Sequence, residues 1–348
     1  MMDEEEFSRQ PVPPRGQILL GTCLSFGITA FLVVLLRVVF RFSRQKFTIS
    51  DVCISLAVVA SMTHSIFDAL CVLKYGYGWH EADLPETIRH AGTPLKLFWL
   101  CQVLFKISIL FTKLSLFFVY YDLLDQVESL SVALSRAVNY FTAIIVFGYY
   151  TAATFVSVFA CTPIYKSWAP KTEGYCINNG AFLYSTAAAN ILTSLLLIGI
   201  PLPLLLRTRF RKREITQLVG LILLGLVDTA CSIVRLSFIA TSATKSHTDT
   251  TWTLIPSTTA ASIEMNVAII AASLVVMRPC FSWIHSFWED QTIIEPGDEG
   301  YSRFHGSVSA KSVVVASAAS SYPQDMELQS SDGASQNGVV ISIDRLRP

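Results

Sequence analysis

Residues 95–124 read LKLFWLCQVLFKISILFTKLSLFFVYYDLL, and this stretch decides how the rest of the chain is interpreted. It is long and apolar enough to cross a bilayer, yet Lys106 and Lys113 lie in its interior. A lysine in the hydrocarbon layer is costly and usually faces protein groups or a water-filled cavity. Because the two lysines are seven residues apart, they return to one helix face within about 20°. The stretch therefore predicts a helix with a cationic face that needs partners from other helices.

The composition places the chain among membrane proteins. It has 348 residues, of which 52% are hydrophobic and 15% charged, with a mean hydropathy of +0.50. A chain this long and this apolar is expected to be a polytopic membrane protein surrounded by lipid. Its net charge is zero, so no electrostatic argument favours a nucleic-acid partner. The acidic start of the chain lacks the positive segment of a cleavable signal peptide, so the first apolar run is expected to remain as a membrane anchor.

Seven apolar runs of spanning length can be drawn. They cover residues 17–40, 49–74, 95–124, 137–160, 181–206, 216–242 and 252–277. The predicted fold is all-α, a bundle of seven transmembrane helices with its termini on opposite sides of the membrane. The first loop holds Arg41, Arg44 and Lys46, and the fifth holds five basic residues between Arg207 and Arg213. By the positive-inside rule these loops are cytosolic, which places the N-terminus outside and the C-terminus in the cytosol.

Three further segments flank the seven runs. The membrane domain is predicted over residues 17–288, after a short extracellular tail at 1–16. Beyond the seventh run, large apolar residues recur at helical spacing as far as Trp288, which predicts a short helix on the inner membrane surface. Cys280 beside it is a candidate for palmitoylation or, alternatively, an unmodified thiol. Residues 289–348 are rich in Ser, Gly and Asp and are expected to form a disordered cytosolic tail.

Four of the eight cysteines are candidates for disulfide bonds. They are expected at or near the outer ends of the second, third and fourth helices or in the fourth loop, and they are Cys71, Cys101, Cys161 and Cys176. The outer side of a membrane is oxidising, so disulfides form and persist there. Four cysteines allow three pairings. A bridge from Cys176 to either Cys101 or Cys161 is favoured.

Seven titratable residues inside the apolar runs are the candidate ligand-binding residues: His64, Asp68, Lys106, Lys113, Asp228, Arg235 and Glu264. Counting about 1.5 Å of rise per residue places Lys113, Asp228 and Glu264 near mid-membrane and the others further out. We predict that all seven line one polar cavity shared by the second, third, sixth and seventh helices. The alternative is a set of buried ion pairs that fixes helix packing and does nothing else.

No cofactor is predicted. A retinal protein needs a Schiff-base lysine, usually in its last helix, and residues 252–277 contain none. No Cys/His spacing resembles a zinc site, and no P-loop, dinucleotide fingerprint or nucleophile elbow is present, so no metal is expected. The sequence contains no catalytic motif, although an intramembrane acid such as Glu264 or Asp228 could act as a proton donor.

A series of short elements along residues 17–280 resembles one protein family. In chain order the elements are Asp51, Gly76, Tyr77, Gly78, Trp79, His80, Lys113, Ser115, Tyr120, Cys161, Pro163, Trp168, Cys176, Gly225, Ser232, Arg235, Trp252, Glu264, Asn266, Arg278 and Pro279. Their order resembles the fungal rhodopsin-like domain family, seven-helix membrane proteins of filamentous fungi that include receptor-like and satratoxin-cluster-type members. Two positions depart from the family pattern: Asp122 stands where an Arg is frequent, and Ser194 stands where an Asp is frequent.

The resemblance implies the fold and a multi-pass location in the plasma membrane or an endomembrane. The leading hypothesis is a non-retinal sensor or receptor-like protein with a small-molecule ligand and a cytosolic signalling partner. One alternative is a membrane-embedded enzyme or accessory protein of secondary-metabolite biosynthesis, because the family includes members associated with such gene clusters. A further alternative is a small-molecule transporter, for which internal repeats are expected and none is evident in the sequence.

Overall fold

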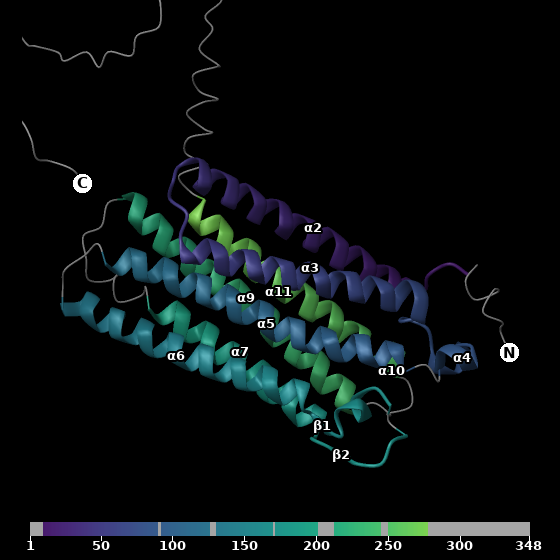
Figure 1. The fold of residues 1–348 in the computed structure, drawn as a ribbon. Coiled ribbons are helices and arrows are strands. Elements are labelled where there is room, and N and C mark those ends of the chain that lie inside the picture. Colours follow the sequence, from purple (N-terminus) through teal and green to yellow (C-terminus); the bar gives the residue numbers. More distant parts are fainter. Residues whose placement is uncertain are drawn as a thin grey trace, which may run out of the picture. The chain divides into compact units, whose positions relative to one another are not determined.

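The computed structural model describes residues 10–89, 92–125, 130–169, 171–200, 212–244 and 250–277. Seven long helices make up most of this part of the chain (Figure 1). They are α2 (Pro14–Ser43), α3 (Ile49–Tyr75), α5 (Thr93–Leu124), α6 (Leu130–Val158), α7 (Asn179–Gly199), α9 (Lys212–Thr244) and α11 (Ile255–Val276). Six of them, all except α9, are candidate membrane spans by length and apolar composition. The predicted all-α class is confirmed, and the six apolar helices are consistent with a multi-pass membrane protein.

The helix limits differ from the prediction mainly at two places. The fourth helix, α6, begins at Leu130 rather than at residue 137. The fifth, α7, ends at Gly199, and residues 201–206 of its predicted range lie outside the described residues. Also outside the described residues are residues 1–9 of the predicted extracellular tail, the juxtamembrane helix with Cys280, the cytosolic tail at 289–348 and most of the basic fifth loop.

Local sequence signals explain where several helices begin and end. A capping box starts α3, because the Thr48 backbone N–H donates to Asp51 Oδ2 at 2.9 Å. The same helix ends at Gly76, whose φ of 69° is the left-handed conformation that glycine adopts without strain. At the start of α7, Asn178 Oδ1 accepts a hydrogen bond from the backbone of Ala181 at 3.1 Å.

The helices pack in a definite set of neighbours. The pairs α3 with α5, α2 with α11, α5 with α6, α7 with α9 and α9 with α11 lie side by side (Figure 1). The core between α2, α3, α5, α6 and α11 includes Ile54, Ile109, Val146 and Met265. Between α7 and α9 the approach is close at Gly225, where an added Cβ would lie 2.4 Å from Ile198 Cγ1.

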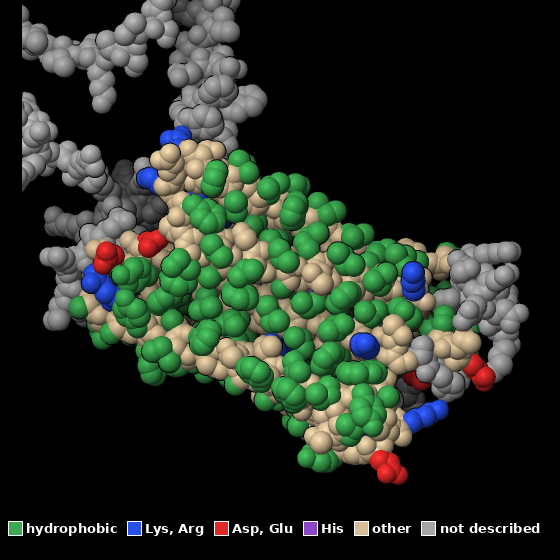
Figure 2. Space-filling model, in the orientation of Figure 1, with side chains coloured by type: hydrophobic (Ala, Val, Ile, Leu, Met, Phe, Trp, Pro, Cys, Tyr) green, Lys and Arg blue, Asp and Glu red, His purple; other side chains and the backbone are tan. Residues whose placement is uncertain are grey.

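The outer surface of the bundle is apolar. Figure 2 shows hydrophobic side chains over the middle of one face, with most of the visible charged side chains near its two ends. Several of the largest apolar side chains are more exposed than buried, including Phe42 at 73%, Ile144 at 71% and Leu134 at 67%. Such a surface suits lipid, because bilayer hydrocarbon is as apolar as these side chains.

One end of the bundle carries a set of short elements, and we call it the disulfide end. The elements are η1 (Glu81–Asp83), α4 (Glu86–Arg89), β1 (Cys161–Thr162), η2 (Ile164–Ser167), β2 (Tyr175–Cys176) and α10 (Thr250–Thr253). Strands β1 and β2 are antiparallel, with Cys161 opposite Cys176. Gly174 allows this pairing, since its φ is 144° and an added Cβ would lie 2.2 Å from Thr162 O.

Candidate functional site

A buried lysine on α5 is held by polar groups of α7. The Lys113 side chain is 4% exposed, and its Nζ donates to Thr193 Oγ1 at 2.7 Å, Ser194 Oγ at 2.9 Å and Asn190 O at 3.2 Å. These three acceptors use the three donors of an ammonium group. Ser194 Oγ in turn lies 2.6 Å from Asp228 Oδ2 on α9. The charges of Lys113 and Asp228 are therefore linked through a serine rather than by direct contact.

A second buried acid, Glu264 on α11, completes the network. Arg235 Nε on α9 lies 2.5 Å from Glu264 Oε2, and Ser232 Oγ donates to Glu264 Oε1 at 2.6 Å. Asn190 Nδ2 also donates to Glu264 Oε1, and Asn190 Oδ1 accepts from Tyr150 OH on α6 at 2.5 Å. Since Asn190 also accepts from Lys113 through its backbone carbonyl, it joins the two halves. We call these side chains the buried charge network.

The buried charge network leaves little free space. A cavity of 40 Å³ lies beside it, bordered by Lys113, Tyr120, Asp228 and Val275. A volume of this size can hold water, for which about 10–15 Å³ is the minimum, but not an organic ligand. Asp228 Oδ1 is buried without a hydrogen-bond partner among the described residues. The two candidate proton donors, Asp228 and Glu264, border neither the 590 Å³ cavity between α9 and α11 nor the 370 Å³ cavity described below.

A separate polar group joins α3 to α5. His64 Nδ1 lies 3.0 Å from Asp68 Oδ2, and Cys101 Sγ lies 3.7 Å from Asp68 Oδ1. The donor atoms of these three buried residues lie within 4.8 Å of one another, so they could hold a metal ion. A closed tetrahedral site needs four ligands, and no fourth candidate within this distance is found among the described residues.

Tyr77 lies in the turn that follows α3, outside the membrane-spanning helices. It is 4% exposed, and its hydroxyl donates to Pro94 O at 3.4 Å. Burial, with smaller contributions from Cys71, Cys101 and Asp68, raises the pKa of the Tyr77 phenol well above its usual value. The side chain is therefore neutral at physiological pH and serves as a hydrogen-bond donor.

Lys106 lies apart from the buried charge network. Its side chain is 2% exposed, and its Nζ donates to Gln102 O at 3.1 Å and Gln102 Oε1 at 3.4 Å. It borders a cavity of 370 Å³ at the disulfide end, which we call the outer cavity. Small-molecule sites have volumes of about 300–1,000 Å³, so the outer cavity can accept an organic ligand.

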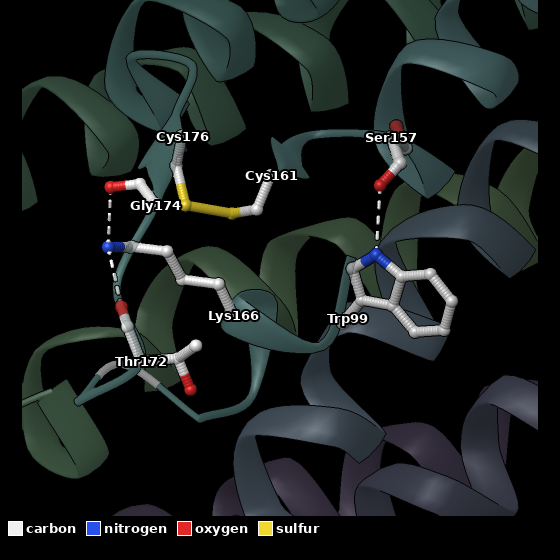
Figure 3. Close-up of a disulfide and its surroundings, with 7 residues drawn as sticks. All are labelled: Trp99, Ser157, Cys161, Lys166, Thr172, Gly174 and Cys176. Atoms are coloured by element: carbon white, nitrogen blue, oxygen red, sulfur yellow. Dashed lines mark hydrogen bonds between the residues drawn. A yellow bond between two sulfur atoms is a disulfide. The ribbon is translucent and has the colours of Figure 1, made fainter. Parts of the chain in front are cut away.

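The disulfide end forms part of the wall of the outer cavity. Cys161 and Cys176 form a disulfide bond, which is one of the two predicted pairings, whereas Cys71 and Cys101 are free buried thiols. Figure 3 shows Lys166 beside this bond, donating to the carbonyls of Thr172 at 2.9 Å and Gly174 at 2.8 Å. Both disulfide cysteines and Lys166 border the cavity.

By their hydrogen bonds and ion pairs, the seven predicted residues fall into three groups. The first is the buried charge network of Lys113, Asp228, Arg235 and Glu264, the second is His64 with Asp68, and the third is Lys106. The prediction also omitted α7, because that helix carries no charged residue. Its Asn190, Thr193 and Ser194 are nevertheless the groups that connect the charges.

Sequence reasoning missed a further buried ion pair at the opposite end of the bundle. Arg37 on α2 is fully buried, and its Nε lies 2.9 Å from Asp51 Oδ1 on α3. Arg37 also donates to Ser50 Oγ at 2.7 Å and to Ala272 O on α11 at 3.1 Å. The signal was present, since Arg37 and Asp51 both lie inside apolar runs. Arg41, which was assigned to the loop, also pairs with Asp51, at 2.9 Å.

Comparisons with known proteins agree with this fold. Residues 36–283 match the fungal rhodopsin domain. A SAT4 family membrane protein of Emericella nidulans is 27% identical over 168 residues, which cover 47% of this chain and 41% of that protein. The chain thus spans about two-fifths of the length of this curated relative. No solved structure matches the chain. Because the match covers most of the chain, the protein belongs to the fungal rhodopsin domain family of membrane proteins.

Proposed function

We propose that this protein is a seven-helix, receptor-like sensor that binds a small molecule in the outer cavity without retinal. In this proposal α9 is the seventh membrane-spanning helix, the disulfide end faces the outside of the membrane, and a cytosolic partner binds the opposite end. The basic loop after α2, with Arg44 and Lys46, supports the orientation through the positive-inside rule. The disulfide Cys161–Cys176 supports it too, because such bonds persist on the oxidising side.

The observation that carries the proposal is the link between a ligand-sized space and the buried charge network. The outer cavity shares Phe98, Gln102 and Leu254 with a smaller cavity of 40 Å³, and Arg235 borders that smaller cavity. Arg235 is held by Glu264, whose other oxygen accepts hydrogen bonds from α7 and α9. A ligand that draws Arg235 toward the cavity would change the contacts among α7, α9 and α11. Packed helices respond to such changes by small rigid shifts.

Proximity labelling in a fungal host tests this function. A biotin ligase is fused to the C-terminus of three full-length chains: the wild type, Glu264→Gln and the control Lys96→Met. Lys96 is an exposed lysine of α5 that lies outside the buried charge network. We expect the wild type and the control to label the same cytosolic signalling proteins, such as a G-protein α subunit, and Glu264→Gln to label a different set.

Two results would contradict the sensor. One is an identical set of labelled proteins for all three chains at equal expression. The other is a change in secondary metabolites, or in flux of a small molecule into vesicles, that follows Glu264→Gln while the labelled proteins stay the same. Identical labelling would mean that the buried charge network only fixes helix packing. A change in metabolites or flux would favour a biosynthetic or transport role.

A further inference from the structure

Lys106 is a buried cation for which the described chain supplies no acidic partner. Ion pairs of the described residues join Arg37 and Arg41 to Asp51, His64 to Asp68, and Arg235 to Glu264, and none of these involves Lys106. Its hydrogen bonds go to two oxygens of the neutral residue Gln102. An ammonium group has three donors, so one remains available. A buried ammonium without a counter-charge is costly, which indicates that an anion completes the site.

Arg235, which borders the smaller cavity beside the outer cavity, also has an unused hydrogen-bond donor. Arg235 is 4% exposed, and its Nη2 atom is buried with no hydrogen-bond partner among the described residues. Its Nε is already occupied by Glu264. Arg235 and Gln102 both border the smaller cavity, and Gln102 and Lys106 both border the outer cavity. Arg235 and Lys106 therefore border two adjoining cavities that share Gln102.

The walls of the outer cavity define what kind of molecule would bind. None of its described lining residues is Asp or Glu, whereas two, Lys106 and Lys166, are cationic. The rest of the wall is largely apolar and aromatic, including Trp99 and Phe182. The ring of Phe182 lies 5.1 Å from Lys106 Nζ, and Trp99 Nε1 donates to Ser157 O at 2.9 Å, which fixes the indole beside the cavity (Figure 3). A positive, apolar cavity favours an acidic group attached to an apolar body.

We propose that the outer cavity binds an amphipathic carboxylic acid, with its carboxylate held by Lys106 and Arg235 and its apolar body against Trp99 and Phe182. The inference rests on the proposed ligand-binding function and names the chemical class of the ligand. A carboxylate suits the site because it accepts several charge-assisted hydrogen bonds at once. Its charge also compensates Lys106, which no residue of the described chain does.

The test uses photoreactive probes that share one tail. The full-length protein is reconstituted in nanodiscs of zwitterionic lipid and exposed to a medium-chain fatty acid that carries a diazirine and an alkyne. The methyl ester and the alcohol with the same tail are the neutral probes, and labelled residues are mapped by mass spectrometry. We expect the acid to label the segments 95–106 and 179–183 about ten- to a hundredfold more than the ester, the range of one hydrogen bond to a charged group.

Variants at the lysine provide the matched comparison. Lys106→Met is expected to lose the preference for the acid, Lys106→Arg to keep most of it, and the exposed Lys96→Met to keep all of it. Without ligand, Lys106→Met should melt at a higher temperature than the wild type, since it removes an uncompensated buried charge. If Lys106→Met does not fold, Leu254→Trp, which narrows the cavity and keeps the lysine, should abolish labelling by the acid.

The outcomes separate this inference from the proposed function. Equal labelling of the cavity by acid and ester would overturn the carboxylate while leaving a ligand cavity. A preference for the acid that survives Lys106→Met would overturn the role of the lysine. If no probe labels either segment, the inference is overturned and the outer cavity is not the ligand site of the proposed sensor. The interaction with a cytosolic partner is tested separately, by proximity labelling.

Discussion

Lys113 and Asp228 are joined through one hydroxyl group: Ser194 Oγ lies 2.9 Å from Lys113 Nζ and 2.6 Å from Asp228 Oδ2. The three residues come from three helices, α5, α7 and α9, so one small side chain mediates a contact between two opposite charges.

Removing this hydroxyl should destabilise the bundle. In Ser194→Ala, Lys113 loses one of its three hydrogen-bond acceptors, and Asp228 Oδ2 loses its hydrogen-bond donor. The other carboxylate oxygen, Asp228 Oδ1, has no hydrogen-bond donor among the described residues even in the wild type. Leaving a buried polar group without a partner costs about 1–3 kcal/mol. Thermal unfolding of the purified protein in detergent measures the loss. The control is Ser185→Ala, an exposed serine of the same helix. Equal melting temperatures for the two variants would show that the serine link is not formed.

The two arginines that share Asp51 should contribute very different amounts to the stability of the protein. The Arg37 side chain is 0% exposed and that of Arg41 is 18% exposed, although each lies 2.9 Å from a different oxygen of the same carboxylate. Breaking a buried pair costs about 3–5 kcal/mol, so Asp51→Asn, which strands Arg37, should unfold most easily. Arg41→Met should cost about 1 kcal/mol or less, because a partly exposed pair contributes little. Denaturant or thermal unfolding of the two variants checks the order, and a reversed order would contradict the burial of Arg37.

The fold was largely predictable from the sequence because long, apolar runs of residues predict membrane-spanning helices. His64 and Asp68 are four residues apart in the sequence, a spacing that puts them on one face of α3, and their side chains lie 3.0 Å apart. The seven-residue spacing correctly placed Lys106 and Lys113 on one face of α5, since Lys106 lies near Phe182 and Lys113 bonds to Thr193, both on α7.

The partners of that face were not predictable in the same way. The sequence argument matched charge with charge, and α7 has hydroxyl and amide groups but no charged residue. Spacing along one helix also says nothing about which neighbouring helix the face meets. For that reason the prediction placed Lys106 in one cavity with the acids, whereas in the structure Lys106 borders the outer cavity.

The disulfide should contribute measurably to stability. Cys161 and Cys176 are separated by 15 residues, and closing a loop of this length stabilises a fold by about 3 kcal/mol in the chain-entropy model. The double variant Cys161→Ser/Cys176→Ser should melt at a lower temperature, and a reducing agent should lower the melting temperature of the wild type but not of the variant. A non-reducing peptide map that joins Cys176 to Cys101 instead would contradict the observed pairing.

The most direct test of the buried charge network is a double-mutant cycle on Arg235 and Glu264. Glu264→Gln, Arg235→Gln and the double variant are compared by unfolding in detergent, with the exposed Glu173→Gln as control. Residues in one ion pair show coupling energies of about 0.5–3 kcal/mol, so the double variant should be less destabilised than the sum of the two single variants. Additive losses, with no coupling energy between the two sites, would contradict a network in which α9 and α11 are held together by this pair.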